Sequence, residues 1–197
     1  KAIEHAYASR SAFDWSPESA LVLGNGSLGL VTLAMLRQEF EEIYCLGRRD
    51  RPDPTIDVVE ELDGTYVVSR ETPVDEIPDV HGGMDFIYEA TGYAKHPIQS
   101  VHGLAPNGVA ALVGISGPWE FEIDGGSLHT ELVVHNKALV GTVNSNERHF
   151  KRAIRTLRAL PEWLFEELIT TVVTPENVAP AFVDDEQIKA VVEFDRL

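Results

Sequence analysis

The chain has 197 residues, enough for one sizeable domain or for a domain with part of a second. Its 32 acidic and 16 basic residues give a formal net charge of −16, which repels nucleic-acid backbones and argues against a nucleic-acid partner. It contains no apolar run of the roughly 18 residues needed to cross a bilayer. Its single cysteine, Cys45, excludes an internal disulfide framework and favours a reducing, cytoplasmic setting.

The acidic residues alternate with regular apolar segments, which indicates a folded chain and not a disordered acidic one. Many surface acids combined with few lysines suit a cytoplasm rich in salt, where screening weakens the self-repulsion of the charges. We therefore expect a salt-adapted, halophilic protein. An acidic protein from an ordinary cytoplasm is the alternative.

The apolar pattern alternates between strands and helices through most of the chain. It predicts a first helix at 1–13, strands at 20–24, 42–47, 65–69, 84–92, 108–116 and 138–143, and intervening helices at 27–40, 54–62 and 97–104. Strand, helix and strand within about 30 residues form a βαβ unit. The repeated unit predicts an α/β fold with a parallel sheet covered on both faces.

The two ends depart from this alternation. The first helix has no strand before it, and the chain becomes helix-rich after Asn144. There the pattern predicts helices at 149–160 and 162–169, a turn-helix at 174–182 and a short strand at 189–194. We therefore expect the chain to be a piece of a larger protein.

A GxGxxG motif follows the first strand and opens the next helix, which is the context that dinucleotide binding requires. It consists of Gly24, Asn25, Gly26, Ser27, Leu28 and Gly29. The first glycine permits the tight turn, the second lets a pyrophosphate approach the backbone, and the third lets helix and strand pack closely. The helix N-terminus offers free N–H groups to the phosphates. A purely structural turn in an unrelated α/β domain is the alternative.

The end of the second strand addresses the choice of cofactor. An acid about 20 residues beyond the glycine loop would bind the ribose 2′-hydroxyl of NAD, but Gly47 occupies that place. Arg48 and Arg49 follow it, and guanidinium groups pair well with phosphate. The sequence therefore predicts NADP in preference to NAD. Alternatively, the two arginines form a solvated loop that pairs with Asp50 and Asp53.

Three further groups follow the ends of predicted strands, where ligands of open α/β sheets bind. They are Thr91, then Val113, Gly114 and Ile115, then Thr142, Val143 and Asn144. We expect Thr91 either to contact the cofactor or to cap the next helix. The backbone at 113–115 is placed to contact a nicotinamide. Asn144 is the best polar candidate for a cofactor or substrate contact, with an ordinary helix N-cap as the alternative.

The sequence shows no catalytic constellation. It lacks a Tyr-x-x-x-Lys pair, which argues against a short-chain dehydrogenase. Its seven histidines are dispersed, and none forms HExxH or a Cys/His cluster with metal-ligand spacing. The residues thus predict a cofactor platform without a visible acid, base or metal site.

Four segments resemble the NADP-binding half of archaeal glucose dehydrogenases, the halophilic ones in particular, which belong to the zinc-containing medium-chain dehydrogenases. The segments are SALVLGNGSLGL, YCLGRRDRPDPTID, MDFIYEATG and HNKALVGTVNS. The resemblance implies a Rossmann fold, a doubly wound six-stranded parallel sheet in the order 3-2-1-4-5-6 with helical segments of the catalytic domain beside it. It also implies a connecting helix at 1–15, an NADP-binding domain at 16–145 and a segment at 146–197 that returns to the catalytic domain.

The resemblance further implies an oxidoreductase that converts D-glucose to gluconolactone by hydride transfer to NADP, with a zinc ion as Lewis acid. The implied cofactor contacts are 25–28 at the pyrophosphate, 47–49 at the 2′-phosphate, and 113–115 and 142–144 near the nicotinamide. Asn144 would also reach the sugar. The zinc ligands would lie in an N-terminal domain outside this chain, so we expect the chain alone to bind NADP without catalysis.

Within this resemblance we expect the parent enzyme to be a homo-oligomer, a dimer or tetramer, that binds a small sugar and contacts neither nucleic acid nor membrane. Two other functions stay open. One is a zinc-independent quinone or enoyl reductase of the same superfamily. The other is a non-catalytic NAD(P)-sensing module, although such modules more often keep the acid that Gly47 replaces.

Overall fold

The computed structural model describes residues 1–183 and 187–194, so the parts of the predicted C-terminal segment at 184–186 and 195–197 lie outside the described residues. The strands are β1 (Ser19–Leu23), β2 (Glu42–Gly47), β3 (Thr65–Val68), β4 (Met84–Glu89), β5 (Leu104–Leu112), β6 (Ala138–Gly141), β7 (Ile169–Val173) and β8 (Lys189–Val192). The helices are α1 (Ala2–Ser9), α2 (Ser27–Leu36), α3 (Pro54–Glu61), α4 (Ile77–His81), α5 (His96–Gly103), α6 (Gly125–Val134), α7 (Glu147–Ala159) and α8 (Glu162–Leu168). Single 3-10 turns are η1 (Val74–Glu76), η2 (Pro175–Asn177) and η3 (Ala179–Phe182).

The main sheet has six parallel strands in the order β3-β2-β1-β4-β5-β6. This confirms both the parallel α/β sheet predicted from the alternation and the doubly wound Rossmann order implied by the resemblance. The order reverses between β1 and β4, so the carboxyl ends of these two strands form the switch point where open α/β sheets bind ligands.

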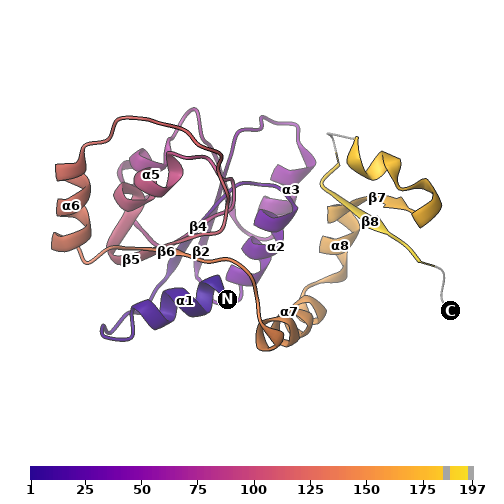
Figure 1. The fold of residues 1–197 in the computed structure, drawn as a ribbon, viewed down its shortest axis with the longest axis horizontal. Coiled ribbons are helices and arrows are strands. Elements are labelled where there is room, and N and C mark those ends of the chain that lie inside the picture. Colours follow the sequence, from indigo (N-terminus) through magenta and orange to yellow (C-terminus); the bar gives the residue numbers. More distant parts are fainter. Residues whose placement is uncertain (184–186, 195–197) are drawn as a thin grey trace.

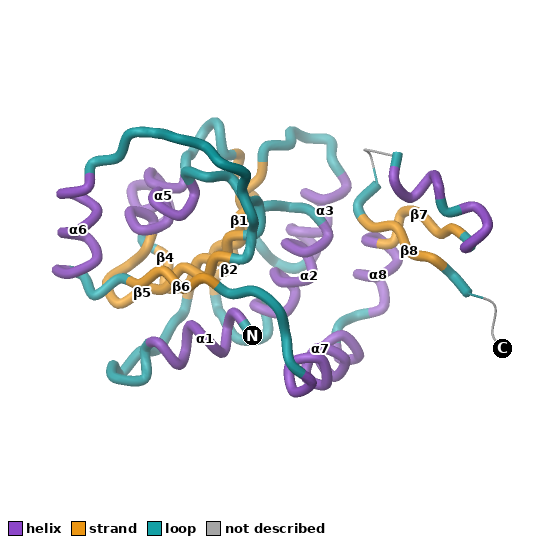
Figure 2. The backbone as a smooth tube through the Cα atoms, in the orientation of Figure 1, coloured by secondary structure: helices purple, strands orange, loops and turns teal. Residues whose placement is uncertain are grey.

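The core consists of two apolar layers, one on each face of the sheet. Alternate residues of β1 divide between them, because successive side chains of a strand point to opposite faces. Ala20 and Val22 pack with residues of α1, α2, α3 and α8, while Leu21 and Leu23 pack with residues of η1 and α4. Figure 1 and Figure 2 show α1 and α5 on opposite sides of the sheet.

Some elements differ from the sequence prediction. The pattern missed α4 and α6, and it took Ile169 as a helix end although it begins β7. The strand expected at 108–116 begins at Leu104 and ends at Leu112, because Leu104 is buried beside Met84 while an irregularity with Asn107 at φ +64° interrupts the pairing. The turn-helix expected at 174–182 is two short 3-10 turns, η2 and η3.

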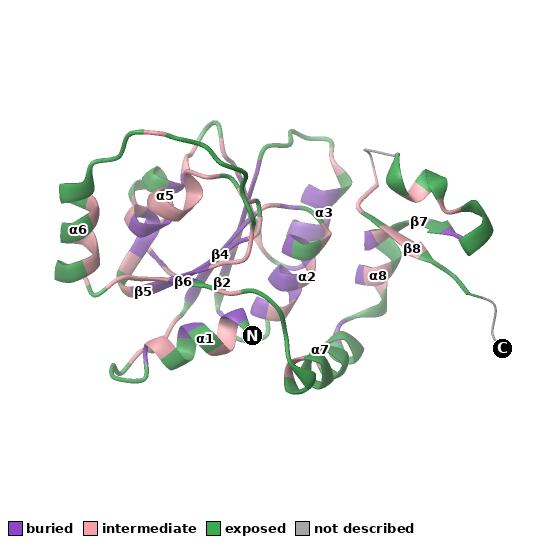
Figure 3. Cartoon of the chain, viewed as in Figure 1, coloured by how far each residue is buried: buried purple, intermediate pink, exposed green. Residues whose placement is uncertain are grey.

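The C-terminal elements lie outside the six-stranded sheet. β7 and β8 form a separate two-stranded parallel sheet. Figure 3 shows α7 almost wholly exposed, and none of its residues is buried. Among the described residues, no helix combines the length and apolar character that a membrane span requires.

Candidate cofactor site

A cavity of about 1030 Å³ opens at the switch point of the main sheet. Its walls come from the glycine loop after β1, the end of β2, the segment after β3, and the segment that runs from β4 into α5. Residues from four consecutive strand ends therefore meet at one place, as the strand order requires.

The glycine loop has the geometry that a phosphate needs. Gly24 adopts φ +109°, which side-chain-bearing residues rarely tolerate. A Cβ on Gly29 would overlap the carbonyl oxygen of Gly24, so only glycine lets α2 start this close to the loop. Gly26 is the N-cap of α2 and supplies no side-chain cap, and the first turn holds no acid. The first N–H groups of α2 thus stay available to an anion.

The other loop residues contribute mainly through the backbone. Asn25 is buried, and its amide donates a 2.6 Å hydrogen bond to the hydroxyl of Thr55 in α3. Its side chain therefore fastens the loop to the next helix. Ser27 and Leu28 form the first turn of α2, with the Leu28 side chain more than half exposed. The cavity wall itself includes Gly24, Asn25 and Gly26.

Gly47 ends β2 in a space that is closed to a side chain. A Cβ there would lie 2.6 Å from Oδ1 of Asn25 and would also collide with the Tyr66 hydroxyl. That hydroxyl is fixed, since it accepts from the Arg49 N–H and donates to the Arg49 carbonyl, both at 3.1 Å. In dinucleotide-binding folds an acid at this position selects NAD. Here Gly47 carries no charge, and the side chains of Asn25 and Tyr66 leave no room for an acid.

The two arginines differ from each other, although both line the cavity. Arg48 is exposed and forms no ion pair with any residue in the described ranges. Arg49 pairs through Nη1 with Oδ2 of Asp53 at 2.9 Å, while Asp50 pairs with Arg70. The alternative of a loop ion pair is thus correct for Arg49 with Asp53 and wrong for Asp50. Of the two arginines, Arg48 is therefore the one whose guanidinium has no carboxylate partner in the described part of the chain.

Glu89, at the end of β4, is a carboxylate with 1 % exposure. Its Oε1 accepts from the N–H of Thr91 at 2.7 Å, the hydroxyl of Thr91 at 2.6 Å and the N–H of Gly92 at 2.8 Å. Burial raises the pKa of Glu89, but the nearby His96 side chain, with Nδ1 3.8 Å from Oε1, and the hydrogen bonds from Thr91 and Gly92 outweigh it and leave the pKa below its ordinary value. The ionised carboxylate fixes the backbone that lines the cavity.

The Thr91 hydroxyl is fully engaged within this loop. Besides donating to Glu89, it accepts from the Tyr93 N–H at 3.0 Å and lies 2.8 Å from Nδ1 of His96. It does not cap the next helix, since the N-cap of α5 is Lys95 without a side-chain bond. Its methyl group faces Gly24. Thr91 can therefore offer a ligand its methyl group and backbone.

Sequence reasoning assigned no role to a histidine, yet His96 lines the cavity. The only signal was its place at the start of the helix after EATG, which is too common to single it out. The sequence also assigns no role to Glu89, because a glutamate at the end of a strand is more often a solvated residue.

The 113–115 segment is loop, contrary to the strand predicted there. The N–H groups of Val113 and Gly114 donate to the Glu89 carbonyl at 2.9 and 3.1 Å, and Gly114 packs against the backbone of Gly92. Ile115 is 84 % exposed. The structure therefore brings this segment to the β4 end, beside the cavity but outside its lining residues.

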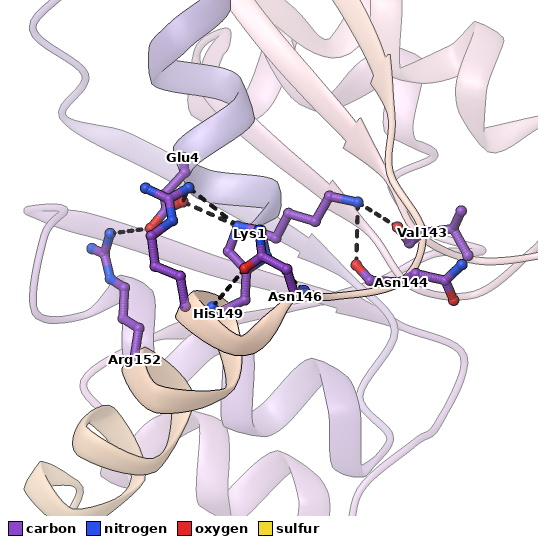
Figure 4. Close-up of polar contacts among 8 residues, drawn as sticks. Lys1, Glu4, Val143, Asn144, Asn146, His149 and Arg152 are labelled. Carbon is purple, nitrogen blue, oxygen red and sulfur yellow. Dashed lines mark hydrogen bonds and ion pairs between the residues drawn. The ribbon is translucent and has the colours of Figure 1, made fainter.

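The 142–144 segment continues the same edge. Thr142 donates its N–H to the Leu112 carbonyl at 3.0 Å, and its buried hydroxyl has no hydrogen-bond partner among the described residues. Lys1 donates through Nζ to the carbonyl of Val143 and, at 3.1 Å, to that of Asn144, as Figure 4 shows. Asn144 has φ +60°, a left-handed conformation that asparagine tolerates.

Asn144 is not the N-cap of the following helix, so that alternative is wrong. The cap is Asn146, whose Oδ1 accepts from the N–H of His149 at 3.1 Å while Nδ1 of His149 accepts from the Asn146 N–H at 3.2 Å. The exposed Asn144 side chain is left free for another contact.

A second charged cluster joins α1 to α7 (Figure 4). Glu4 accepts from Nη1 of Arg152 at 2.6 Å and from Nη2 of Arg148 at 2.9 Å, with Nε2 of His149 at 3.3 Å. The hydrogen bond from Arg152 is the main cause of a Glu4 pKa below its ordinary value. The cluster fixes α7, and through it the chain that follows Asn144.

The described ranges hold no group of three or more His, Cys, Asp or Glu side chains placed to bind a metal ion. The single thiol, Cys45, is buried in the core, which raises its pKa to about 12. A thiol with that pKa is neither nucleophile nor metal ligand near neutral pH. The residues that carry chemistry here are those of the cavity.

Comparison with known proteins gives a consistent result. The family described as "Glucose dehydrogenase C-terminus" matches residues 1–194. A glucose 1-dehydrogenase of Haloarcula marismortui is 63 % identical over all of this chain and 56 % of its own length. One of Haloferax mediterranei is 62 % identical over 98 % of this chain and 56 % of its own.

Among solved structures, the Haloferax mediterranei glucose dehydrogenase in complex with NADP, Zn and gluconolactone superposes with a TM-score of 0.96 at 60 % identity. The match covers 100 % of this chain and 56 % of that one. The chain thus spans about half the length of the relatives it matches.

Proposed function

Because the chain belongs to the family of glucose dehydrogenase C-termini, we propose that it is the NADP-binding portion of a glucose 1-dehydrogenase. The parent enzyme oxidises D-glucose to gluconolactone. The observation that carries the proposal is the cavity at the switch point, where an uncapped helix N-terminus, an acid-free β2 end and the unpaired guanidinium of Arg48 meet.

The residues present fit NADP, which accepts a hydride when it is bound. In this proposal the N–H groups at the start of α2, within 25–28, bind the pyrophosphate. Arg48 binds the 2′-phosphate, and Arg49 joins it by giving up its pair with Asp53. The segments 113–115 and 142–144 lie beside the nicotinamide. The unpartnered hydroxyl of Thr142 is the kind of group that a ligand satisfies.

The described residues do not form a zinc site. We therefore assign the zinc ligands and most sugar contacts to the part of the parent enzyme outside this chain, with Asn144 reaching the sugar from this side. Accordingly, the chain alone binds NADP and does not oxidise glucose.

Calorimetric titration with NADP and NAD, at one fixed concentration of KCl, tests the cofactor assignment. We expect NADP to bind more tightly, because only NADP carries the 2′-phosphate that the arginines recognise. Equal affinities, or tighter binding of NAD, would contradict the assignment.

Replacing the arginines sharpens this test. Arg48→Ala together with Arg49→Ala should weaken NADP binding by about 1–3 kcal/mol for each charged hydrogen bond lost, and leave NAD nearly unchanged. Of the single variants, Arg48→Ala should cost more, because Arg49 is already paired. The matched control is Arg155→Ala with Arg158→Ala, which removes the same charge from the exposed face of α7.

We also propose the domain division implied by the resemblance, with 1–15 as connecting helix, 16–145 as NADP-binding domain and 146–197 as a return to the catalytic domain. The exposed apolar side chains of Phe150, Ile154 and Leu157 on α7 support it, because such a stripe normally packs against something. In the intact enzyme, Phe150→Ser should destabilise by about 2 kcal/mol or more. A change within about 0.5 kcal/mol would mean that the face is uncovered.

The proposed parent is a homo-oligomer. β6 is one of the two outer strands of the six-stranded sheet, and an outer strand has one edge that can pair with another chain. We propose that two copies meet along this strand. A monomeric mass of the intact enzyme by light scattering would rule this out.

A further inference from the structure

His96 occupies an unusual place in the cavity wall. It is the first residue of α5, and its side chain is 12 % exposed. Its ring lies edge-on to that of Tyr93, with 4.9 Å between the ring centroids. Nδ1 is 2.8 Å from the Thr91 hydroxyl, and no hydrogen bond to Nε2 occurs within the described part of the chain. One ring nitrogen is therefore fixed by the protein while the other is available.

The hydrogen-bond network determines which nitrogen carries the proton. Ionised Glu89 can only accept, so the single hydroxyl proton of Thr91 points to Glu89 at 2.6 Å. Toward His96 the Thr91 oxygen must then accept, which places the proton of the neutral imidazole on Nδ1. Nε2 consequently carries a lone pair and is a hydrogen-bond acceptor.

In the proposed function, the cavity that His96 lines holds the adenosine end and the pyrophosphate of the cofactor, because Gly24, Asn25 and Gly26 of the glycine loop also line it. It includes Arg48 and Arg49, the proposed 2′-phosphate contacts, and its lining does not include 113–115 or 142–144, the proposed nicotinamide contacts. Gln99, one turn further along α5, also lines it, and Gln99 is held by a 2.9 Å bond to Asp75 of the segment that follows β3. His96 therefore lies on a part of the cavity wall that a hydrogen bond between α5 and the segment after β3 holds in place.

We propose that His96 is a further cofactor-contacting residue, whose Nε2 accepts a hydrogen bond from a donor on the adenosine end, and that Glu89 and Thr91 are positioning residues that set its tautomer. The donor is the amino group of adenine or a ribose hydroxyl, because these are the N–H and O–H groups of that end. This inference rests on the proposed function, since it assumes that NADP occupies the cavity.

Titration of the protein with 2′,5′-ADP, which carries the adenosine end and no nicotinamide, tests the contact. His96→Phe keeps a ring beside Tyr93 and removes the acceptor, and it should weaken binding by about tenfold. His102→Phe, on the same helix and outside the cavity lining, is the matched control and should bind 2′,5′-ADP with the affinity of the unmodified chain. The hypoxanthine analogue of 2′,5′-ADP, with a carbonyl in place of the amino group, identifies the donor.

A loss with the analogue that disappears in His96→Phe assigns the contact to the amino group. A loss in His96→Phe that is equal for both compounds assigns it to a ribose hydroxyl. Unchanged affinity of His96→Phe for 2′,5′-ADP overturns the contact. If the parent protein binds neither NADP nor 2′,5′-ADP, the proposed function itself fails, which is a different result.

The tautomer is tested separately by nitrogen NMR of the imidazole in the ligand-free protein. We expect a protonated Nδ1 and an unprotonated Nε2. Thr91→Val, which removes the hydroxyl and keeps the shape, should release a mixture of tautomers and weaken 2′,5′-ADP binding several-fold. Thr91→Ser, which keeps the hydroxyl, should restore the single tautomer and the affinity for 2′,5′-ADP. A proton on Nε2 in the parent protein overturns the positioning role, whether or not the cofactor binds.

Discussion

Glu89 and Glu4 are two carboxylates that this chain stabilises in opposite ways. Glu89 is buried at a strand end, and its partners are two backbone N–H groups and a hydroxyl, all within two or three residues along the chain. Glu4 is 23 % exposed in its side chain and is held by Arg148 and Arg152, which come from a helix more than 140 residues away. Both have a lowered pKa, so a shift in the same direction has two different causes.

The contrast shows which contacts define the site and which join its parts. Short-range, neutral donors in a buried place fix atoms closely and are insensitive to salt. Long charged side chains at a surface join distant elements weakly, and their strength depends on the ionic medium. Short-range neutral hydrogen bonds to Glu89 hold the wall of the cavity. Long charged side chains around Glu4 attach α7 to α1.

The largest expected difference between the two is in stability. Glu89→Ala leaves two backbone N–H groups and a hydroxyl without their acceptor, and it should cost about 3 kcal/mol or more. Glu4→Ala should cost about 1 kcal/mol or less, because exposed ion pairs contribute little. Urea unfolding of both variants measures this. Similar costs would show that the two carboxylates do not differ in kind.

An intermediate effect is expected in their titration. A folded-state pKa below the unfolded value adds stability above the ordinary glutamate range near 4.5, and this stability is lost as the pH falls through the lower folded value. In molar KCl the shift of Glu4 should largely disappear, since the Debye length falls to about 3 Å, while that of Glu89 should persist. Carboxyl-carbon NMR titrations at low and high KCl check both sites. A pKa shift of Glu89 that disappears in molar KCl would contradict the difference between the two carboxylates.

The smallest effect is the energy that couples Glu4 to Arg152. A double-mutant cycle should give about 0.5 kcal/mol at low salt and close to zero in molar KCl. Over the same range the stability of the whole chain should rise, because screening reduces the repulsion within a net charge of −16. The local ion pair and the global charge thus respond to KCl with opposite signs. Overall stability that is independent of salt would count against salt adaptation.

The features of the fold that repeat along the sequence were predictable. The alternation of apolar segments gives the parallel sheet, and GxGxxG gives the position of Gly24, Gly26 and Gly29. Local signals failed where backbone geometry decides. Nothing in the sequence shows that Glu89 is satisfied by N–H groups next to it, and this network is what gives His96 its orientation.

Other features depend on pairs that lie far apart or compete. Lys1 donates to the carbonyl of Asn144, 143 residues further along the chain, which no local pattern can indicate. The sequence offers Arg49 two kinds of partner, the phosphate of a bound cofactor and the carboxylate of Asp53. Which of them it contacts in the free chain is decided by the fold, and it is Asp53. Residues 169–173 pair with β8, and their β-branched sequence ITTVV itself favours a strand, so here a signal that was present in the sequence was missed.

The closed space around Gly47 has a consequence for redesign of the cofactor preference. If the proposed NADP site is correct, an aspartate at Gly47 is the direct route toward NAD, but the Cβ of any side chain there would collide with Oδ1 of Asn25 and the hydroxyl of Tyr66. The proposed preference for NADP over NAD would therefore depend on the lack of space at Gly47 as well as on the positive charge of the arginines. A successful change of cofactor would have to begin by replacing Tyr66 with a smaller residue and only then install the acid.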